Sequence, residues 1–138
     1  MTFLDDYAPA AHWFVRLAFA SVFLFHGLQK ALMSGPYEMM VGKMGMPAPV
    51  FYLVTFAEVA AGAGVLVGPF MSDLITRLAG LAGAPVMLGA IFIVHLPHGW
   101  SFMNEGPGGI EFPAVLFLLS LYFLLVGNRT PGSAVQVE

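Results

Sequence analysis

The sequence predicts an all-α integral membrane protein that folds as a four-helix bundle. Hydrophobic residues occupy 59% of the 138 positions and charged residues only 9%, whereas a soluble domain carries about 25% charged residues. Four apolar segments each approach the roughly 17 to 25 residues that a spanning helix needs. Because lipid offers no hydrogen-bond partners, their backbone groups must be satisfied within helices. The expected spans are about 12–33, 49–70, 74–96 and 110–126, within a single transmembrane domain, 1–138.

The first span has a defined beginning and end. Trp13 suits the membrane interface, where indole rings anchor helices, and a Ser-Gly-Pro sequence interrupts the helix after Met33. The preceding residues are acidic and contain no basic region, so we expect this span to stay in the mature protein rather than act as a cleaved signal. The mixed polar and apolar residues of 34–49 predict a short helix at the interface.

The second and third spans carry the residues that set helix packing. Ala60, Gly64 and Gly68 recur at four-residue spacing, so a neighbouring helix can approach closely and the second span should be central. In the third span Pro85 lacks a backbone donor and should kink or loosen the helix, which we expect to stop at Pro97. The fourth span follows a glycine-rich loop and is the shortest.

Charge and cysteine content exclude several classes of protein. The formal net charge is −3 and there is no basic run, so the chain lacks the electrostatic footprint of a nucleic-acid-binding protein. It has no cysteine, which excludes disulfides, thiolate metal sites, cysteine-ligated iron–sulfur clusters and thiol–disulfide exchange by this chain itself. A redox role would therefore use another group, a bound cofactor or a partner protein.

The lipid bilayer is the first expected partner. We predict an integral protein of a prokaryotic cell membrane with both termini inside. The orientation depends on Arg16, Arg77 and Arg129 toward one face against Lys30 and Lys43 toward the other, because basic residues favour the inner side.

Six ionisable side chains lie in or beside the apolar segments, although charge at membrane depth is costly and usually functional. In any four-span topology the end of span one, the start of span two, the end of span three and the start of span four share one face. At about 1.5 Å per residue, His26 lies about 10 Å and Glu58 about 13 Å below that face, and the other four lie nearer the surface. The predicted one-sided polar pocket comprises His26, Lys30, Glu58, His95, His98 and Glu111.

Within this group, His26 and Lys30 are four residues apart and share a helix face, which should look into the bundle. Glu58 is expected to offset the charge of Lys30, and a cation at Lys30 disfavours a second charge on His26. The simplest alternative is a buried polar cluster that only fixes the helix register.

The same residues also allow two alternative interpretations, a metal site and a haem site. His95 and His98 are three apart and could present two imidazoles to one metal, with Glu105 or Glu111 as third ligand. No metal ligand set is assigned on this basis. A b-type haem between His26 and His95 would need both at similar depth, which the topology does not favour. Methionines could bind Cu(I), although methionine is also a common apolar filler; those in the first connection are Met39, Met40, Met44 and Met46.

The opposite membrane face carries a smaller group of charges. Arg16 lies close enough to the end of its helix for its side chain to reach the lipid headgroups, and Asp73 and Arg77 are four residues apart. We interpret these three residues as headgroup contacts or a salt bridge at the rim of the membrane.

Four motifs occur in a specific order: RLxxxxxFLFHGxxK from Arg16, AEVAAG around Glu58, TRL at Arg77 and GGIEF around Glu111. Together they resemble the DoxX family of small four-span membrane proteins, and the resemblance covers nearly the whole chain up to Gly127. It implies a four-helix membrane bundle. The family takes its name from a subunit of an archaeal thiosulfate:quinone oxidoreductase, so the resemblance also implies a membrane component of a redox system.

The first functional hypothesis is a membrane subunit of a quinone-linked oxidoreductase that works with a redox partner protein. The quinone is implied by the resemblance. His26 and Lys30 would donate hydrogen bonds to the quinone oxygens, and Glu58 or Glu111 would exchange protons with solvent.

Two other functions remain open. Aromatic residues such as Phe25, Phe51 and Trp100 would cap the pocket, which suits other small amphipathic ligands equally well. The same polar residues could line a path for a small solute or a proton; a single four-span bundle leaves little room for a pore, so this would require a homo-oligomer. The third hypothesis is a membrane assembly partner without catalytic activity.

Overall fold

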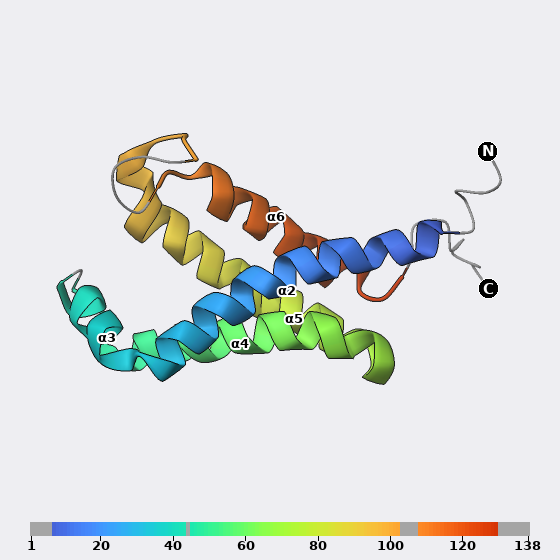
Figure 1. The fold of residues 1–138 in the computed structure, drawn as a ribbon. Coiled ribbons are helices and arrows are strands. Elements are labelled where there is room, and N and C mark those ends of the chain that lie inside the picture. Colours follow the sequence, from blue (N-terminus) through green and yellow to red (C-terminus); the bar gives the residue numbers. More distant parts are fainter. Residues whose placement is uncertain (1–6, 44, 103–107, 130–138) are drawn as a thin grey trace.

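The described part of the chain is mostly helical. The computed structural model describes residues 7–43, 45–102 and 108–129, and these ranges contain no strand. The predicted all-α fold is therefore confirmed. The elements in Figure 1 are α2 (Ala8–Leu32), α3 (Ser34–Lys43), α4 (Ala48–Met71), α5 (Asp73–Gly89), η1 (Ala90–His95), η2 (Leu96–His98) and α6 (Glu111–Val126).

Three stretches are long and apolar enough to cross a membrane: Ala10–Leu32, Ala48–Met71 and Asp73–His98. The fourth apolar helix, α6, has 16 residues, which at 1.5 Å per residue makes about 24 Å against about 30 Å for a bilayer core. The fourth span is thus the shortest, as predicted. The chain is an integral membrane protein, and its treatment as one domain over 1–138 stays a prediction.

Helix α4 lies between α2 and α5, and α6 packs against α5. Glycines on α4 permit this arrangement. A Cβ on Gly62 would lie 2.7 Å from the side chain of Leu24 on α2, and a Cβ on Gly64 would lie 2.7 Å from the side chain of Ala79 on α5. Because a larger residue would push the helices apart, the small-residue pattern holds α4 against both neighbours. The predicted central position of the second span is confirmed.

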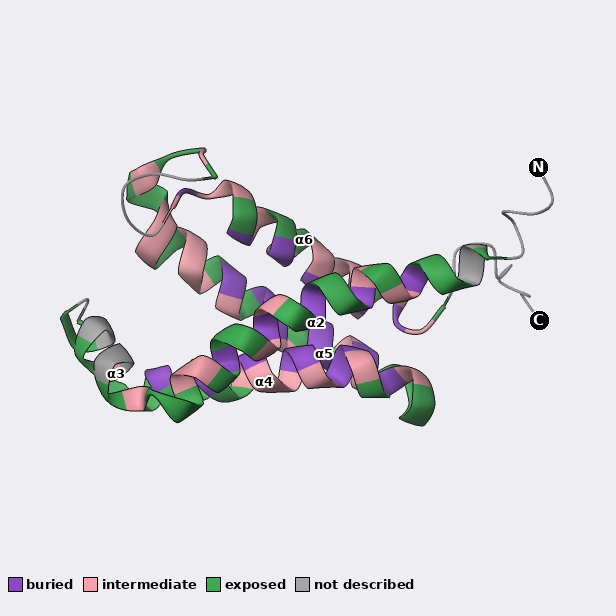
Figure 2. Cartoon of the chain, in the orientation of Figure 1, coloured by how far each residue is buried: buried purple, intermediate pink, exposed green. Residues whose placement is uncertain are grey.

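An aromatic layer formed by Phe19, Phe23 and Phe123 lies at the centre of the bundle. All three side chains are at most 1% exposed, and the ring centroids of Phe19 lie 4.3 Å from Phe23 and 5.2 Å from Phe123. Buried residues follow the inward faces of the helices (Figure 2).

The bundle has two unlike ends. At the closed end α2 begins, α4 turns into α5 and α6 finishes. At the open end, which carries α3 and η1, the pair α2 and α4 diverges from the pair α5 and α6 (Figure 1). The outline is a V in which the closed end holds the four helices together.

The third span departs from a regular α-helix. Helix α5 runs through Pro85 to Gly89, the π-helix η1 follows, and the 3₁₀-helix η2 extends the span to His98. Pro85 therefore does not end the helix, and the irregular geometry begins after Gly89. The predicted stop at Pro97 is one residue early, because Pro97 occupies the first turn of η2, where a backbone donor is not required.

Helix α3 is the short connecting helix that the sequence predicted. It begins directly after α2, and its Glu38 accepts a hydrogen bond from the hydroxyl of Tyr52 on α4. This contact ties the connection to the start of the second span.

Candidate functional site

Side chains of α2, α4, α6 and the third span enclose a cavity of about 350 Å³ at the open end. Each of the four predicted spans contributes to its wall. Of the six residues predicted to form a pocket, four line it. We call it the polar cavity; its lining residues are Val22, Phe23, His26, Lys30, Glu58, Met87, Ala90, Val94, His95, Phe112, Pro113 and Leu116.

An ion pair between Lys30 and Glu58 forms the polar wall of this cavity. Lys30 Nζ donates to Glu58 Oε1 at 2.5 Å, and the two side chains are 18% and 5% exposed. Gly27 lets α2 and α4 come close enough for this contact, since a Cβ there would lie 2.8 Å from the side chain of Val59. The helix backbones, and not only two flexible side chains, therefore hold the pair in place.

The second carboxylate oxygen of Glu58, Oε2, is buried and has no hydrogen-bond partner in the described part of the chain. Leaving a buried acceptor unsatisfied costs roughly 1–3 kcal/mol. An unused acceptor on a residue that lines a cavity is therefore a candidate partner for a donor group on a bound molecule.

His95 lines the polar cavity because of the π-helix. In an α-helix, residues five apart are separated by about 140° around the axis, whereas the i to i+5 hydrogen bonds of a π-helix bring them close to one face. Ala90 and His95 accordingly line the same cavity. Figure 1 shows this segment opposite α2 across the V.

The tautomer of His95 follows from its partner. His95 Nδ1 lies 3.0 Å from the carbonyl oxygen of Gly108. Because a carbonyl can only accept, Nδ1 must donate, and the neutral ring keeps its lone pair on Nε2. Gly108 has a φ of 76°, which glycine adopts without strain. The loop backbone thus prepares His95 as an acceptor or a proton-accepting base.

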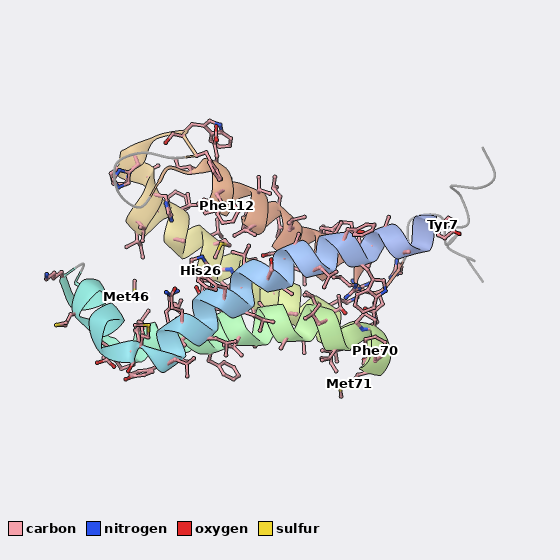
Figure 3. The ribbon with its side chains drawn as sticks, viewed as in Figure 1. Tyr7, His26, Met46, Phe70, Met71 and Phe112 are labelled. Carbon is pink, nitrogen blue, oxygen red and sulfur yellow. The ribbon has the colours of Figure 1, made fainter. Side chains whose placement is uncertain are left out.

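His26 lies at the mouth of the polar cavity. Its side chain is exposed, its ring meets that of Phe25 edge to face at 5.5 Å, and it makes no hydrogen bond with the described residues. His26 is six residues before the end of α2, or about 9 Å along the axis. The mouth therefore lies below the end of the helix, and Figure 3 shows His26 on α2 and Phe112 on α6 at this open side.

The other two predicted pocket residues, His98 and Glu111, do not line the cavity. His98 is in η2 and Glu111 is the first residue of α6, where a carboxylate favours the positive end of the helix dipole. Phe25 and Trp100 are 61% and 71% exposed and do not cap the cavity as expected; Phe112, which was not predicted, lines it instead. A functional role for all six residues stays a prediction.

A second hollow of about 280 Å³ adjoins the polar cavity at the ion pair. It lies between α4 and the third span, and apart from Lys30 and Glu58 its lining is apolar. We call it the apolar groove; its lining residues are Lys30, Met46, Val50, Phe51, Val54, Glu58, Pro85, Val86, Gly89, Ala90, Ile93 and Val94.

The described residues place no group of three or more histidine, aspartate or glutamate side chains where they could hold a metal ion. Two residues of the metal alternatives, Glu105 and Met44, lie outside the described residues. His26 and His95, the pair considered for haem, both line the polar cavity.

At the closed end, Arg16 differs from its expected position at the headgroups: it is only 1% exposed. Its guanidinium donates to the carbonyl oxygens of Val65 and Gly127 and to the side chains of Thr76 and Asn128. The Gly127 carbonyl lies at the C-terminus of α6, whose partial negative charge stabilises a nearby cation. The Val65 carbonyl lacks its usual helical donor, because Pro69 has no N–H. Arg16 therefore binds carbonyl and side-chain oxygens inside the bundle, and not lipid headgroups.

The rest of the predicted rim group behaves as a salt bridge. Arg77 Nε donates to Asp73 Oδ2 at 2.5 Å, and Arg77 also donates to carbonyl oxygens at the end of α6. The sequence did not reveal the nearby contact between His12 Nδ1 and the hydroxyl of Tyr122, at 3.0 Å. This contact shows that the start of α2 and the end of α6 lie at the same end of the bundle.

Comparisons with known proteins give one family and one sequence relative. The DoxX family model matches residues 11–96, a range that includes His26, Lys30, Glu58 and His95. A protein of Bacillus subtilis (strain 168) named "Putative oxidoreductase CatD" is 32% identical over 116 residues, which cover 83% of this chain and 78% of that protein. No solved structure gives a significant match.

Proposed function

This chain belongs to the DoxX family, and we propose that it is a membrane subunit of a quinone-linked redox system whose polar cavity binds the quinone head group. The similar Bacillus protein carries an oxidoreductase name, which supports a redox role. The quinone itself is inferred from the family resemblance and from the chemistry of the cavity.

One observation supports the proposal: the buried Oε2 of Glu58 has no hydrogen-bond partner among the described residues and belongs to a residue that lines a cavity. Quinol hydroxyls are hydrogen-bond donors, and this oxygen can accept from one of them. His95 Nε2 offers a second acceptor, since Nδ1 is committed to the Gly108 carbonyl. The site therefore suits the reduced head group.

The oxidised head group has carbonyl oxygens, which only accept hydrogen bonds. The Lys30 ammonium has three donors, of which Glu58 receives one. Lys30 can therefore donate to a quinone carbonyl without leaving the ion pair. A wall that offers both donors and acceptors fits both redox states.

Protons and electrons take separate routes in this proposal. Glu58 and His95 hold or release the protons that accompany quinone reduction and quinol oxidation. In this proposal the electrons come from or go to a redox partner protein; the chain itself has no cysteine with which to ligate an iron–sulfur cluster.

The aromatic layer favours a binding site over a path through a single chain. Along α2, Phe19 and Phe23 lie between His26 and the buried Arg16, and Phe123 packs against Phe19. These three side chains are at most 1% exposed. A solute in the polar cavity would have to displace this layer to reach the closed end.

The test is quinone binding to purified protein in lipid nanodiscs. Organic extraction and mass analysis would identify retained quinone, and titration with a tailless methylated benzoquinol under reducing conditions would measure affinity. Glu58→Gln should weaken binding at least about tenfold, because hydrogen bonds to charged groups contribute about 1.5–3 kcal/mol. The matched control is Glu38→Gln, which changes a carboxylate on α3 outside the cavity.

Unchanged affinity in a folded Glu58→Gln protein would refute the proposal. Proton or solute flux in proteoliposomes that disappears in the same variant would favour the transport alternative. A visible absorption band of the purified protein would favour haem.

A further inference from the structure

The apolar groove has the character of a site for a hydrocarbon chain. Its walls are Met46, Val50, Phe51 and Val54 on one side and Pro85, Val86 and Ile93 on the other. Its polar groups are Lys30 and Glu58, which already pair with each other. The volume of about 280 Å³ lies at membrane depth, where the natural occupant is apolar.

The groove is continuous with the polar cavity. Lys30, Glu58, Ala90 and Val94 line both spaces, so the ion pair stands where one ends and the other begins. A molecule with its polar head beside Glu58 can therefore extend an attached chain into the groove.

Gly89 leaves part of this groove open. It lies in α5 with a φ of −58°, which any residue can adopt, and a Cβ added there would meet nothing within 4 Å. Neither backbone geometry nor close helix contact requires glycine at this position, although glycine costs about 1 kcal/mol relative to alanine in a helix. The effect of the missing side chain is to keep the groove empty.

We propose that the apolar groove holds the hydrocarbon tail of the quinone whose head group occupies the polar cavity, so that the protein takes alkylated or prenylated quinones in preference to tailless ones. This inference rests on the proposed function. A phospholipid is a poorer occupant, because the Glu58 oxygen that has no partner among the described residues needs a donor, and a phosphodiester offers only acceptors, whereas a quinol offers a hydroxyl.

The groove positions the tail of the bound molecule and does not attract it through the hydrophobic effect. A tail leaving lipid for the groove gains little transfer free energy, since lipid chains are as apolar as the groove. What the groove provides is a fixed direction for the tail, and hence a fixed position for the head beside Lys30 and Glu58. Filling the groove should therefore affect tailed molecules and spare tailless ones.

The experiment compares two probes in nanodiscs: a tailless methylated benzoquinone and the same benzoquinone with a decyl chain. Gly89→Leu should weaken binding of the decyl probe at least about fivefold, because overpacking an occupied space costs about 1 kcal/mol or more. Binding of the tailless probe should be unchanged. Gly42→Leu is the matched control, since a Cβ at Gly42 also meets nothing within 4 Å and Gly42 lies in α3, outside the groove.

The outcomes separate this inference from the proposed function. If the wild-type protein binds the tailless probe and Gly89→Leu binds both probes as the wild type does, the groove is not a tail site and the proposed function stands. If neither probe binds the wild type, the proposed function fails and the inference fails with it. If Gly89→Leu loses only a copurifying phospholipid in native mass spectrometry, a lipid occupies the groove and the inference is wrong.

Discussion

Replacing Lys30 with methionine should destabilise the bundle more than replacing Glu58 with glutamine. The two partners of the ion pair are not equally buried: the side chain of Glu58 is 5% exposed and that of Lys30 is 18% exposed. Lys30 is also only two residues from the end of α2, or about 3 Å along the axis, so its ammonium can reach the membrane surface when unpaired. The buried carboxylate of Glu58 cannot reach the membrane surface in this way.

The magnitudes follow from this asymmetry. Lys30→Met leaves a carboxylate buried and uncompensated, which costs about 3–5 kcal/mol. Glu58→Gln leaves a lysine that can move outward and should cost about 1–3 kcal/mol. The double variant removes both charges and should resemble Glu58→Gln alone, which gives an interaction free energy equal in magnitude to the cost of Lys30→Met, about 3–5 kcal/mol. These are large fractions of a typical total stability of about 5–15 kcal/mol.

The assay is reversible unfolding in mixed micelles, with helix content followed by circular dichroism as the fraction of denaturing detergent rises. All four members of the double-mutant cycle are measured at neutral pH, and none includes a ligand. The free energies of unfolding then measure how much the ion pair contributes to stability, with no ligand or activity involved.

Equal destabilisation by the two single variants would contradict the assigned burial. An interaction free energy near zero would contradict it more directly, because it would mean that water already screens the pair. In that case the polar cavity would be a wet surface cleft, and the unpartnered oxygen of Glu58 would need no ligand.

Two further predictions address the closed end and the π-helix. Arg16→Lys should lower the free energy of unfolding by about 2–4 kcal/mol, because an ammonium lacks the forked donors that reach carbonyls of two helices at once. The same detergent titration measures this free energy. A loss as small as that of a substitution at an exposed position would contradict the hydrogen bonds assigned to Arg16. Deleting Phe92, which is 64% exposed, should convert η1 to an α-helix in which Ala90 and His95 are four residues apart, or about 40° around the axis, so His95 should still face the polar cavity. Benzoquinol affinity and helix content should then be unchanged, and a large loss of affinity would contradict the shared face of Ala90 and His95.

The order and packing of the helices could be predicted from the sequence because they depend on local patterns. Segment length and apolar content gave the spans, and Gly64 and Gly68 indicated that the second span is closely packed. The pairing of Lys30 with Glu58 was also predictable, since an unpaired charge at that depth is costly and few opposite charges are available.

The parts that could not be predicted depend on partners distant in sequence. An arginine near a helix end is compatible with either a headgroup contact or an internal cap, and the carbonyls that bind Arg16 belong to Val65 and Gly127. No motif indicates the π-helix, so His95 was predicted in the pocket from its position along the span and not from its helix register. Glu111 was placed in the pocket by its position near the face, but the cavity is lined by the following residues of α6, Phe112 and Pro113.

The V-shaped outline explains why the polar cavity and the apolar groove occur together. At the closed end α4 meets α5 through small residues such as Gly64 and Ala79, whereas at the open end the same helices present Phe51 and Val86. Helices with small contacts at one end and large ones at the other must diverge.

Helix α2 does not take part in this divergence from α4, because Gly27 and Gly62 hold the two helices together along their length. The ion pair of Lys30 and Glu58 is therefore fixed on one arm of the V, and His95 is carried on the other. A ligand that contacts both Glu58 and His95 must bridge the two arms, so its affinity depends on how widely the V opens. Substitutions that enlarge the contacts between α4 and α5 should accordingly alter ligand binding while leaving the ion pair intact.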